Sequence, residues 1–221
     1  HTVVLGGNHV SYFGKETLKN HSFVDYVIQG KGERAFTELI EKKSLCDIKN
    51  LIWRKDNQII TNSREGPILE DSPLHPDNLP QKDYSLISLN EYWENHNKIF
   101  SYLPENPLPI LTHEGCVWRD KSRGGCSFCA ITKEKRINRS PKKLWEEISK
   151  ARNELGIQLV KDWGDSITGD KKWLKEFISA RPNKLNDLQF YVYGNTNEIN
   201  EETANLLEKL NVTSIYLGYE A

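Results

Sequence analysis

Apolar runs of strand length alternate with amphipathic helical stretches along the second half of this chain. Four strand-like runs and three helical patterns follow one another in turn, at residues 108–113, 140–155, 157–163, 170–180, 188–194, 200–210 and 214–220. This order is typical of a parallel sheet whose strands are connected by helices. The pattern predicts an α/β fold for residues 108–221, either half of a (β/α) barrel or one side of a doubly wound sheet.

A shorter series of the same kind opens the chain. Strand-like runs at 3–5 and 24–30 alternate with helical patterns at 15–20 and 33–42, and the first run stops at Gly6-Gly7. Strand, helix, strand and helix in this order again predict parallel pairing.

The middle of the chain has a different pattern. The stretch "LIWRKDNQIITN" (51–62) predicts a β-hairpin with its turn at Asp56-Asn57. Six of the nine prolines lie between residues 67 and 107, which predicts an extended linker. We therefore expect three parts, at residues 1–45, 46–107 and 108–221.

Composition narrows the class of protein. Lys and Arg total 30 against 31 Asp and Glu, which gives no electrostatic argument for nucleic acid or an anionic membrane as a partner. No apolar run approaches the roughly 18–20 residues of a spanning helix, and no signal peptide is visible, so we expect a cytoplasmic protein. The chain contains no Met and starts within a strand-like run, and we expect it to be a segment of a longer protein. The basic stretch "KEKRINR" (133–139) is expected to be solvated.

Three of the four cysteines lie within fourteen positions, in the loop that follows the run at 108–113. Cys126 and Cys129 are too close together for an ordinary structural disulfide, and Cys46 lies far upstream. Thiolates are soft ligands, so the group of Cys116, Cys126 and Cys129 suits zinc or an iron–sulfur cluster.

Two metal sites compete at this loop. His113 would complete a tetrahedral zinc set with the three cysteines, as in a zinc-stabilised binding module. Three features favour an iron–sulfur cluster. The loop follows the first strand of a β/α series, where such folds place their chemistry. An aromatic residue, Phe128, precedes the last cysteine, and three cysteines leave one iron of a cubane without a protein ligand.

The pattern Cys116…Cys126-Ser127-Phe128-Cys129 resembles that of the radical S-adenosylmethionine (SAM) enzymes, whose usual spacing is C-x3-C-x2-C with an aromatic before the third cysteine. Here nine residues separate the first two cysteines. The stretches "VVLGGNH" and "VDYVIQGKGE" resemble the carboxyl half of the cobalamin (B12)-binding domain that precedes the barrel in one large group of these enzymes. Asn8 and Lys31 depart from that group's pattern, which has Pro and Glu there.

The resemblance implies a fold and a set of site residues. Residues 1–45 would be the C-terminal part of a Rossmann-like B12-binding domain, and residues 108–221 the first half of a partial (β/α) TIM-type radical SAM barrel. Cys116, Cys126 and Cys129 would bind a [4Fe-4S] cluster. SAM would meet Phe128, Asp165, Ser166, Asn195 and Glu220, with Asp162 as a further candidate beside Asp165 for its ammonium group. Gly6 and Gly7 would let the backbone approach cobalamin. Family members often carry a cation after the third strand for the SAM carboxylate, and the stretch "YGNTNE" (193–198) has none.

The resemblance also implies an activity. The enzyme would cleave SAM reductively and transfer a methyl group, with cobalamin, to an unactivated centre of a small-molecule or peptide substrate. Its electron donor would be a flavodoxin or a ferredoxin. Two alternatives stay open: the zinc-stabilised binding module, and a radical SAM enzyme of non-methylating type whose B12-like domain lacks cobalamin.

Overall fold

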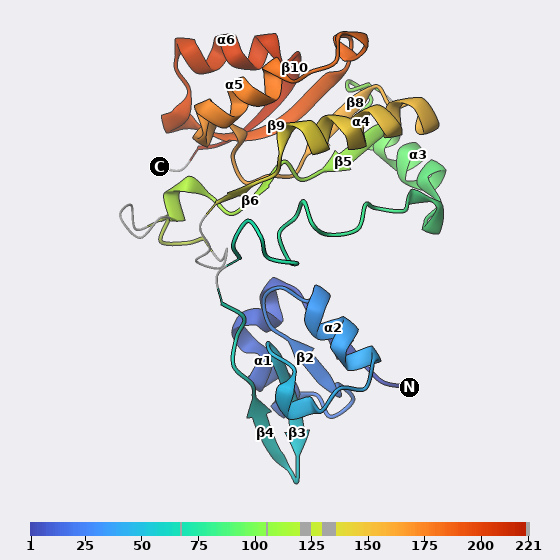
Figure 1. Cartoon of the computed structure of the whole chain (residues 1–221), viewed down its shortest axis with the longest axis vertical. Coiled ribbons are helices and arrows are strands. Elements are labelled where there is room, and N and C mark those ends of the chain that lie inside the picture. Colours follow the sequence, from blue (N-terminus) through green and yellow to red (C-terminus); the bar gives the residue numbers. More distant parts are fainter. Residues whose placement is uncertain (67, 105, 120–124, 130–135, 220–221) are drawn as a thin grey trace. The chain divides into compact units, whose positions relative to one another are not determined.

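The computed structural model describes residues 1–66, 68–104, 106–119, 125–129 and 136–219. These residues form two compact units. Residues 1–75 with 128 and 129 make up the first, and the other described residues belong to the second. Each unit is built around a four-stranded sheet (Figure 1).

The sheet of the first unit has the order β1-β2-β3-β4. Its elements are β1 (Val4–Leu5), α1 (Asn8–Asn20), β2 (Tyr26–Ile28), α2 (Glu33–Ile40), β3 (Leu51–Lys55) and β4 (Gln58–Thr61). The first two strands are parallel, as the sequence predicts. Val10 and Leu18 of α1 pack with Val27 on one face, and Ala35 of α2 packs with Ile28 on the other, so the sheet lies between the two helices.

The predicted hairpin is confirmed as β3 and β4. Asp56 and Asn57 both have positive φ, 46° and 64°, as a two-residue turn with the right twist requires. The sequence predicts this hairpin within the connecting segment, and that boundary is wrong. Tyr26 of β2 pairs antiparallel with Trp53 of β3, which makes the hairpin part of the first sheet.

The proline-rich segment contains a helix that the sequence did not predict. None of the side chains of α3 (Leu89–Ile99) is fully buried, although Leu89, Tyr92, Trp93 and His96 recur at helical spacing. The helix is attached to β5 through the indole N–H of Trp93, which donates to the Pro107 carbonyl over 3.1 Å. The expected extended linker is therefore wrong for this part.

The main sheet of the second unit has the order β10-β9-β8-β5, and all its strands are parallel. The elements are β5 (Pro107–Ile110), α4 (Pro141–Leu155), β8 (Leu159–Asp162), α5 (Lys171–Ser179), β9 (Gln189–Asn195), α6 (Glu201–Lys209) and β10 (Val212–Gly218). A short antiparallel pair, β6 (His113–Glu114) and β7 (Ile137–Asn138), joins the two ends of the cysteine loop. The α/β fold with a parallel sheet is confirmed.

One core joins this sheet to all three helices. Phe190 of β9 packs with Trp145 of α4, Phe177 of α5 and Leu207 of α6, all buried. The Trp145 and Phe177 rings stack with centroids 4.7 Å apart. Because one connected core holds residues from α4, α5 and α6, these three helices cover the same face of the sheet (Figure 1).

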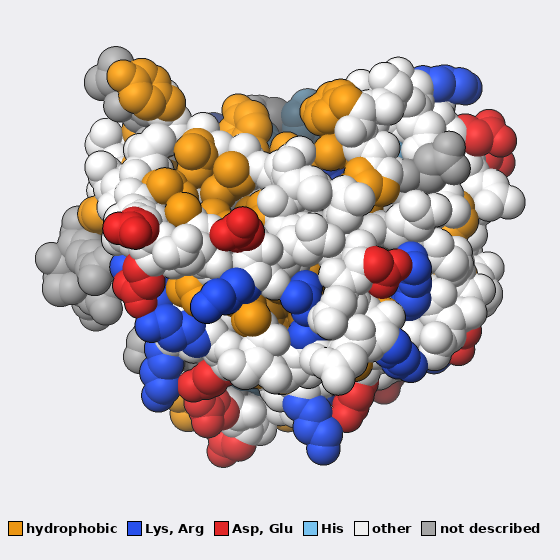
Figure 2. Space-filling view, turned by 90° about the horizontal axis from the view of Figure 1, so that it is seen from above, with side chains coloured by type: hydrophobic (Ala, Val, Ile, Leu, Met, Phe, Trp, Pro, Cys, Tyr) orange, Lys and Arg blue, Asp and Glu red, His pale blue; other side chains and the backbone are white. Residues whose placement is uncertain are grey.

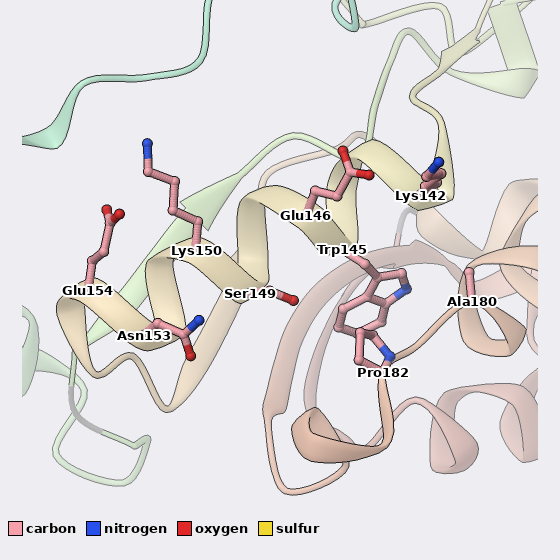
Figure 3. Close-up of a pocket in the computed structure, with 9 residues that line it drawn as sticks. All are labelled: Lys142, Trp145, Glu146, Ser149, Lys150, Asn153, Glu154, Ala180 and Pro182. Atoms are coloured by element: carbon pink, nitrogen blue, oxygen red, sulfur yellow. The ribbon is translucent and has the colours of Figure 1, made fainter.

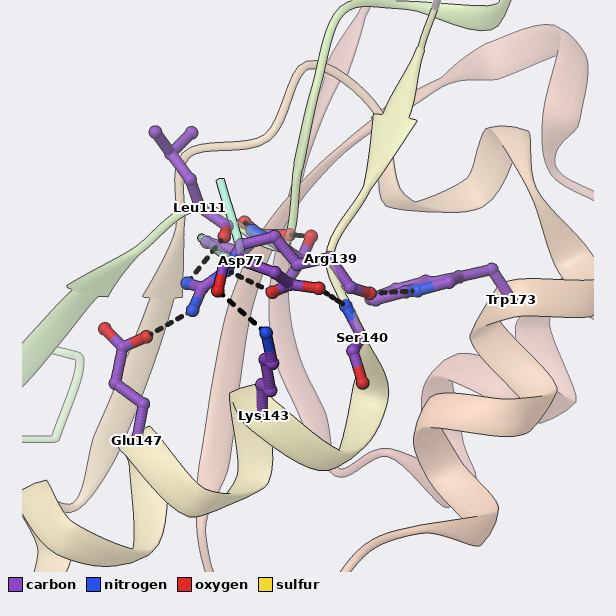
Figure 4. Close-up of polar contacts among 9 residues, drawn as sticks. Asp77, Leu111, Arg139, Ser140, Lys143, Glu147 and Trp173 are labelled. Atoms are coloured by element: carbon purple, nitrogen blue, oxygen red, sulfur yellow. Dashed lines mark hydrogen bonds and ion pairs between the residues drawn. The ribbon is translucent and has the colours of Figure 1, made fainter. Parts of the chain in front are cut away.

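The helix α4 starts at a polar junction with the proline-rich segment (Figure 4). Ser140 is at the predicted N-cap position, but its side chain makes no capping bond. Its backbone N–H donates instead to Asp77 Oδ2 over 2.6 Å. Arg139 bridges Asp77 and Glu147, with N–O distances of 3.3 Å and 2.7 Å. Arg139 is therefore tied into the structure, and the expectation of a solvated stretch is wrong for this residue.

Candidate functional site

The carboxyl ends of β5, β8 and β9 lie at one edge of the parallel sheet. The polar side chains that follow these strands interlock there, and we call them the strand-end network: Thr112, His113, Asp162, Ser166, Thr168 and Glu198. Segments 50 or more residues apart in sequence meet in this network because parallel strands bring equivalent ends together.

Asp162 ties the end of β5 to the end of β8. Its Oδ1 accepts from the backbone N–H groups of Thr112 and Gly164, each over 3.0 Å, and its Oδ2 accepts from Thr112 Oγ1 over 2.7 Å. Burial raises the pKa of this carboxyl, and the three hydrogen bonds oppose that effect. Both oxygens are engaged within the protein, so the geometry does not favour Asp162 as a contact for the SAM ammonium.

His113 is fully buried and uses both ring nitrogens. Nε2 accepts from the Ser166 backbone N–H over 3.1 Å, so the neutral ring carries its proton on Nδ1. Nδ1 then donates to Thr112 Oγ1 over 2.8 Å, and the Thr112 hydroxyl in turn donates a hydrogen bond to Asp162 Oδ2. Burial and the neighbouring Arg136 hold the pKa of His113 well below its usual range.

These bonds contradict the zinc alternative as the sequence framed it. A zinc ligand needs a free nitrogen lone pair, and the His113 lone pair at Nε2 is taken by a backbone donor. The backbone of Gly164 also lies in close contact with the His113 ring. A Cβ at Gly164 would lie 2.2 Å from His113 Cε1, so only glycine fits there.

Glu198 is a network residue that the sequence analysis missed. Its Oε1 accepts from Trp118 Nε1 over 2.7 Å, and its Oε2 accepts from Thr168 Oγ1 over 2.6 Å and from the Ser166 hydroxyl. Glu198 therefore ties the turn after β9 to the turn after β8 and to the cysteine loop. The only sequence signal was an acid that ends the polar run after a buried strand.

Two of the three cysteines lie beside this network. The half-buried thiol of Cys116 receives the Trp118 backbone N–H. Burial is the main reason that its pKa is raised, and the charges of Asp165, Glu198 and Cys126 raise it further. Asp165, the first candidate for the SAM ammonium, accepts from the Gly115 backbone, and burial raises its pKa. The structure thus brings Cys116, Cys126 and Asp165 into one neighbourhood.

The other predicted residues are placed differently. Cys129 is partly buried, Phe128 is exposed, and both group with the first unit. Asn195 accepts the Asn197 backbone N–H over 2.9 Å, as in a polar turn. Glu220 lies outside the described residues. Among the residues that are described, no three side chains of His, Cys, Asp or Glu are gathered as a metal site.

Arg136 follows the cysteine loop and lies in the same neighbourhood. Its Nε donates to Asn138 Oδ1 over 2.7 Å, and its Nη1 donates to the Ser166 carbonyl. Burial lowers its pKa, while Asp170, Asp162 and Glu198 oppose that effect. The expectation that this basic stretch is solvated is therefore wrong for Arg136 as well.

In the first unit, Gly6-Gly7 ends β1 and opens α1. Gly7 has φ 95°, a conformation that side chains disfavour. Ser11 Oγ donates to the Gly7 carbonyl over 2.9 Å and accepts from the Gly30 N–H over 2.8 Å. One buried hydroxyl thus fixes the turns after β1 and β2 together.

Two surface features do not belong to the site. A groove runs along α4 (Figure 3), lined by Lys142, Trp145, Glu146, Ser149, Lys150, Asn153, Glu154, Ala180 and Pro182, and none of these residues belongs to the strand-end network. Basic and acidic side chains are interspersed on the face in Figure 2, in keeping with the balanced composition. In the described part of the chain, no helix has the length and apolarity to span a membrane.

No model of a known protein family matches the chain. A methyltransferase of uncharacterised function from Pyrococcus horikoshii is 24% identical over 229 residues, which cover 99% of this chain and 45% of the relative. The cytidylyl-2-hydroxyethylphosphonate methyltransferase of Streptomyces wedmorensis is 26% identical and is matched over 80% of this chain and 36% of its own length. The anaerobic magnesium-protoporphyrin IX monomethyl ester cyclase of Cereibacter sphaeroides is 24% identical over 70% of this chain and 24% of its own length.

Two solved enzymes share the fold over nearly the whole chain. The radical SAM methyltransferase TsrM of Kitasatospora setae, solved with tryptophan and a SAM analogue, has a TM-score of 0.70 at 20% identity, over 98% of this chain and 41% of its own. The cobalamin-dependent radical SAM enzyme OxsB, solved with aqua-cobalamin and SAM, has a TM-score of 0.72 at 12% identity, over 99% of this chain and 31% of its own. This chain is similar in sequence to methyltransferases and in fold to cobalamin-binding radical SAM enzymes.

The radical SAM resemblance that the sequence carried is thereby confirmed, and so is the prediction of an enzyme family. TsrM has also been solved with cobalamin and a [4Fe-4S] cluster bound, so the cofactors predicted here are those of a structural neighbour. The chain spans less than half the length of each of these radical SAM relatives and neighbours that it matches.

Proposed function

We propose that the chain is part of a cobalamin-dependent radical SAM methyltransferase. Residues 1–75 would be the C-terminal part of the B12-binding domain, and residues 108–221 the first half of the radical SAM barrel. The observation that carries the proposal is the cysteine loop at the carboxyl end of β5, beside a buried polar network, in a fold that TsrM and OxsB share. The position of all three helices on one face of the parallel sheet supports a barrel over a doubly wound sheet.

The chemistry of the donor set fits a cluster. Three cysteine thiolates suit iron, and they leave one iron open to the amino and carboxylate groups of SAM. Cys116 and Cys126 are close enough for the charge of the Cys126 thiolate to raise the pKa of Cys116. When bound, the reduced cluster supplies the electron that cleaves a carbon–sulfur bond of SAM.

This chain's own residues would bind and orient SAM. Asp165 stands beside Cys116 and would hold the SAM ammonium, since a carboxylate and an ammonium pair well at a partly buried site. Ser166 would help to position the turn after β8 rather than bind SAM through its hydroxyl, because that hydroxyl already donates to Glu198. Phe128, Asn195 and Glu220 remain candidates for the adenosine part. The network residues other than Glu198 are buried, which keeps the strand ends in position and excludes water from between them.

Methyl transfer is favoured by the names of two relatives and of TsrM. The cyclase among the relatives keeps the non-methylating alternative open. Gly6 and Gly7 would admit cobalamin at the turn that Ser11 holds. The substrate is a small molecule or a peptide, and a flavodoxin or ferredoxin would donate electrons.

The test uses the full-length protein, reconstituted anaerobically with iron, sulfide and cobalamin and then reduced with SAM present. We expect 5′-deoxyadenosine or S-adenosylhomocysteine as a product, and label from methyl-labelled SAM to appear on cobalamin. Cys126→Ser abolishes turnover, whereas Cys46→Ser, at an exposed cysteine of the first unit, leaves it unchanged. SAM cleavage without methyl uptake by cobalamin would favour the non-methylating alternative, and no cleavage at all would refute the proposal.

A further inference from the structure

One side-chain nitrogen of Arg136 is buried and finds no hydrogen-bond partner in the described part of the chain. The Arg136 Nε and Nη1 are fixed by Asn138 and by the Ser166 carbonyl. Its Nη2 is buried and has no hydrogen-bond acceptor among the described residues. Buried donors without a partner are rare in proteins and call for an explanation, such as a ligand that completes the site.

The neighbouring acids do not fill this role. Asp162 spends its oxygens on Thr112 and Gly164. Asp170 accepts from Asn138 Nδ2 over 2.8 Å and from the backbone N–H of the first turn of α5 over 3.0 Å. Asp162 and Asp170 partly offset the charge of the Arg136 guanidinium, but neither accepts a hydrogen bond from its Nη2.

The position of Arg136 indicates what that ligand is. Arg136 lies close enough to Cys116 and to Asp165 for electrostatic effects: the Cys116 thiolate raises the pKa of Arg136, and the Arg136 charge lowers the pKa of Asp165. A fixed cation and a carboxylate therefore stand together beside a predicted cluster ligand. An amino acid head group carries one carboxylate and one ammonium, so this pair is complementary to it in charge.

Resting on the proposed function, we propose that Arg136 binds the α-carboxylate of SAM through Nη2, while Asp165 takes the ammonium group. Arg136 thereby supplies the cation that the turn after β9 lacks, where the sequence has only Asn195, Thr196, Asn197 and Glu198. It reaches the site from the far end of the cysteine loop, because the pairing of β6 with β7 returns the chain to the end of β5.

The test is a thermodynamic cycle in the full-length, cluster-loaded enzyme. Equilibrium dialysis measures the dissociation constants of SAM and of decarboxylated SAM, which lacks only the carboxylate, for wild type and for Arg136→Gln. We expect the substitution to weaken SAM binding about 10- to 100-fold, as for loss of a charge-assisted hydrogen bond. Binding of decarboxylated SAM should change by less than about threefold, because the partner of Arg136 is already absent.

Two controls protect the result. Arg152→Gln removes another arginine that donates to a backbone carbonyl and pairs with an aspartate, at the opposite end of β8, and should leave both constants unchanged. Iron content must match wild type in every variant. If Arg136→Gln does not fold, Arg136→Lys runs the same cycle and should show a smaller coupling of the same sign.

The outcomes separate the two claims. Equal weakening of SAM and decarboxylated SAM by the Arg136 substitution would overturn this inference and leave the proposed function intact. The same holds if the substitution shifts the reduction potential of the cluster without coupling to the carboxylate. A full-length protein that binds neither cluster nor SAM would instead refute the proposed function itself.

Discussion

Replacing Gly164 by Ala tests whether the strand-end network is as rigid as its contacts imply. The new Cβ would lie 2.2 Å, 2.5 Å and 2.9 Å from Cε1, Nδ1 and Nε2 of His113. An ordinary contact needs about 3.5 Å or more, so the ring must move by roughly 1 Å. It cannot move without lengthening its bonds to Thr112 Oγ1 and to the Ser166 N–H.

The expected cost follows from these contacts. Overpacking a dense interior costs about 1–3 kcal/mol. Leaving a buried hydrogen-bonding group unpaired costs about 1–3 kcal/mol more. Because His113 is fully buried, water cannot replace the lost hydrogen bonds, and the free energy of unfolding should fall by about 2–6 kcal/mol. A glycine-to-alanine change without a clash would instead be near neutral or stabilise by about 0.4–1 kcal/mol.

Urea unfolding, followed by circular dichroism and by tryptophan fluorescence, measures this difference. The matched control is Gly66→Ala, where an added Cβ meets no atom within 4 Å and the backbone is not in the left-handed region. It should change the free energy of unfolding by less than about 1 kcal/mol. If Gly164→Ala cost no more than Gly66→Ala, the buried position of His113 against Gly164 would be refuted.

Two further predictions concern the same network. Glu198→Ala should lower the free energy of unfolding by about 1–3 kcal/mol, because the Trp118 indole N–H, which can only donate, then loses its acceptor. Glu208→Ala on the exposed side of α6 should change it by less than about 0.5 kcal/mol, and equal effects in urea unfolding would count against the network. His113 has a folded pKa well below its usual value of about 6.5, because burial and Arg136 disfavour its charged form, so the unfolded chain binds the proton first and stability is lost as pH falls below about 6.5. Imidazole NMR signals should show that His113 is still neutral in the folded protein below pH 6.5, and titration near 6.5 would contradict its bonded, buried state.

The alternation of strands and helices was readable from the sequence because apolar runs of strand length alternate with amphipathic stretches. The burial of Lys161 and Asp162 was not readable, although all four residues of β8 are buried. α3 was not recognised because the prolines on either side of it indicate an irregular segment, although Leu89, Tyr92, Trp93 and His96 recur at helical spacing. The hairpin was readable from its turn, but its partner strand was not, because pairing between distant strands leaves no local signal.

The candidate site was predictable only in part. The cysteines and Asp165 stand out by type and by position after a strand. Arg136 lies in a basic stretch that looks solvated, and Glu198 ends a polar turn, so the sequence does not show that either residue is partly buried and bonded to the turn after β8. Their roles depend on three strand ends meeting at one edge of the sheet, which the register of the parallel strands determines.

The central claim is that Cys116, Cys126 and Cys129 hold an iron–sulfur cluster. Anaerobic reconstitution of the full-length protein with iron and sulfide, in the presence of zinc, tests it most directly. We predict a brown protein with broad visible absorbance and about four irons per site. Cys46→Ser should behave like wild type, and Cys126→Ser should lose most of the iron. A colourless protein that takes up one zinc ion, or a Cys126→Ser variant that keeps its full iron content, would contradict the account.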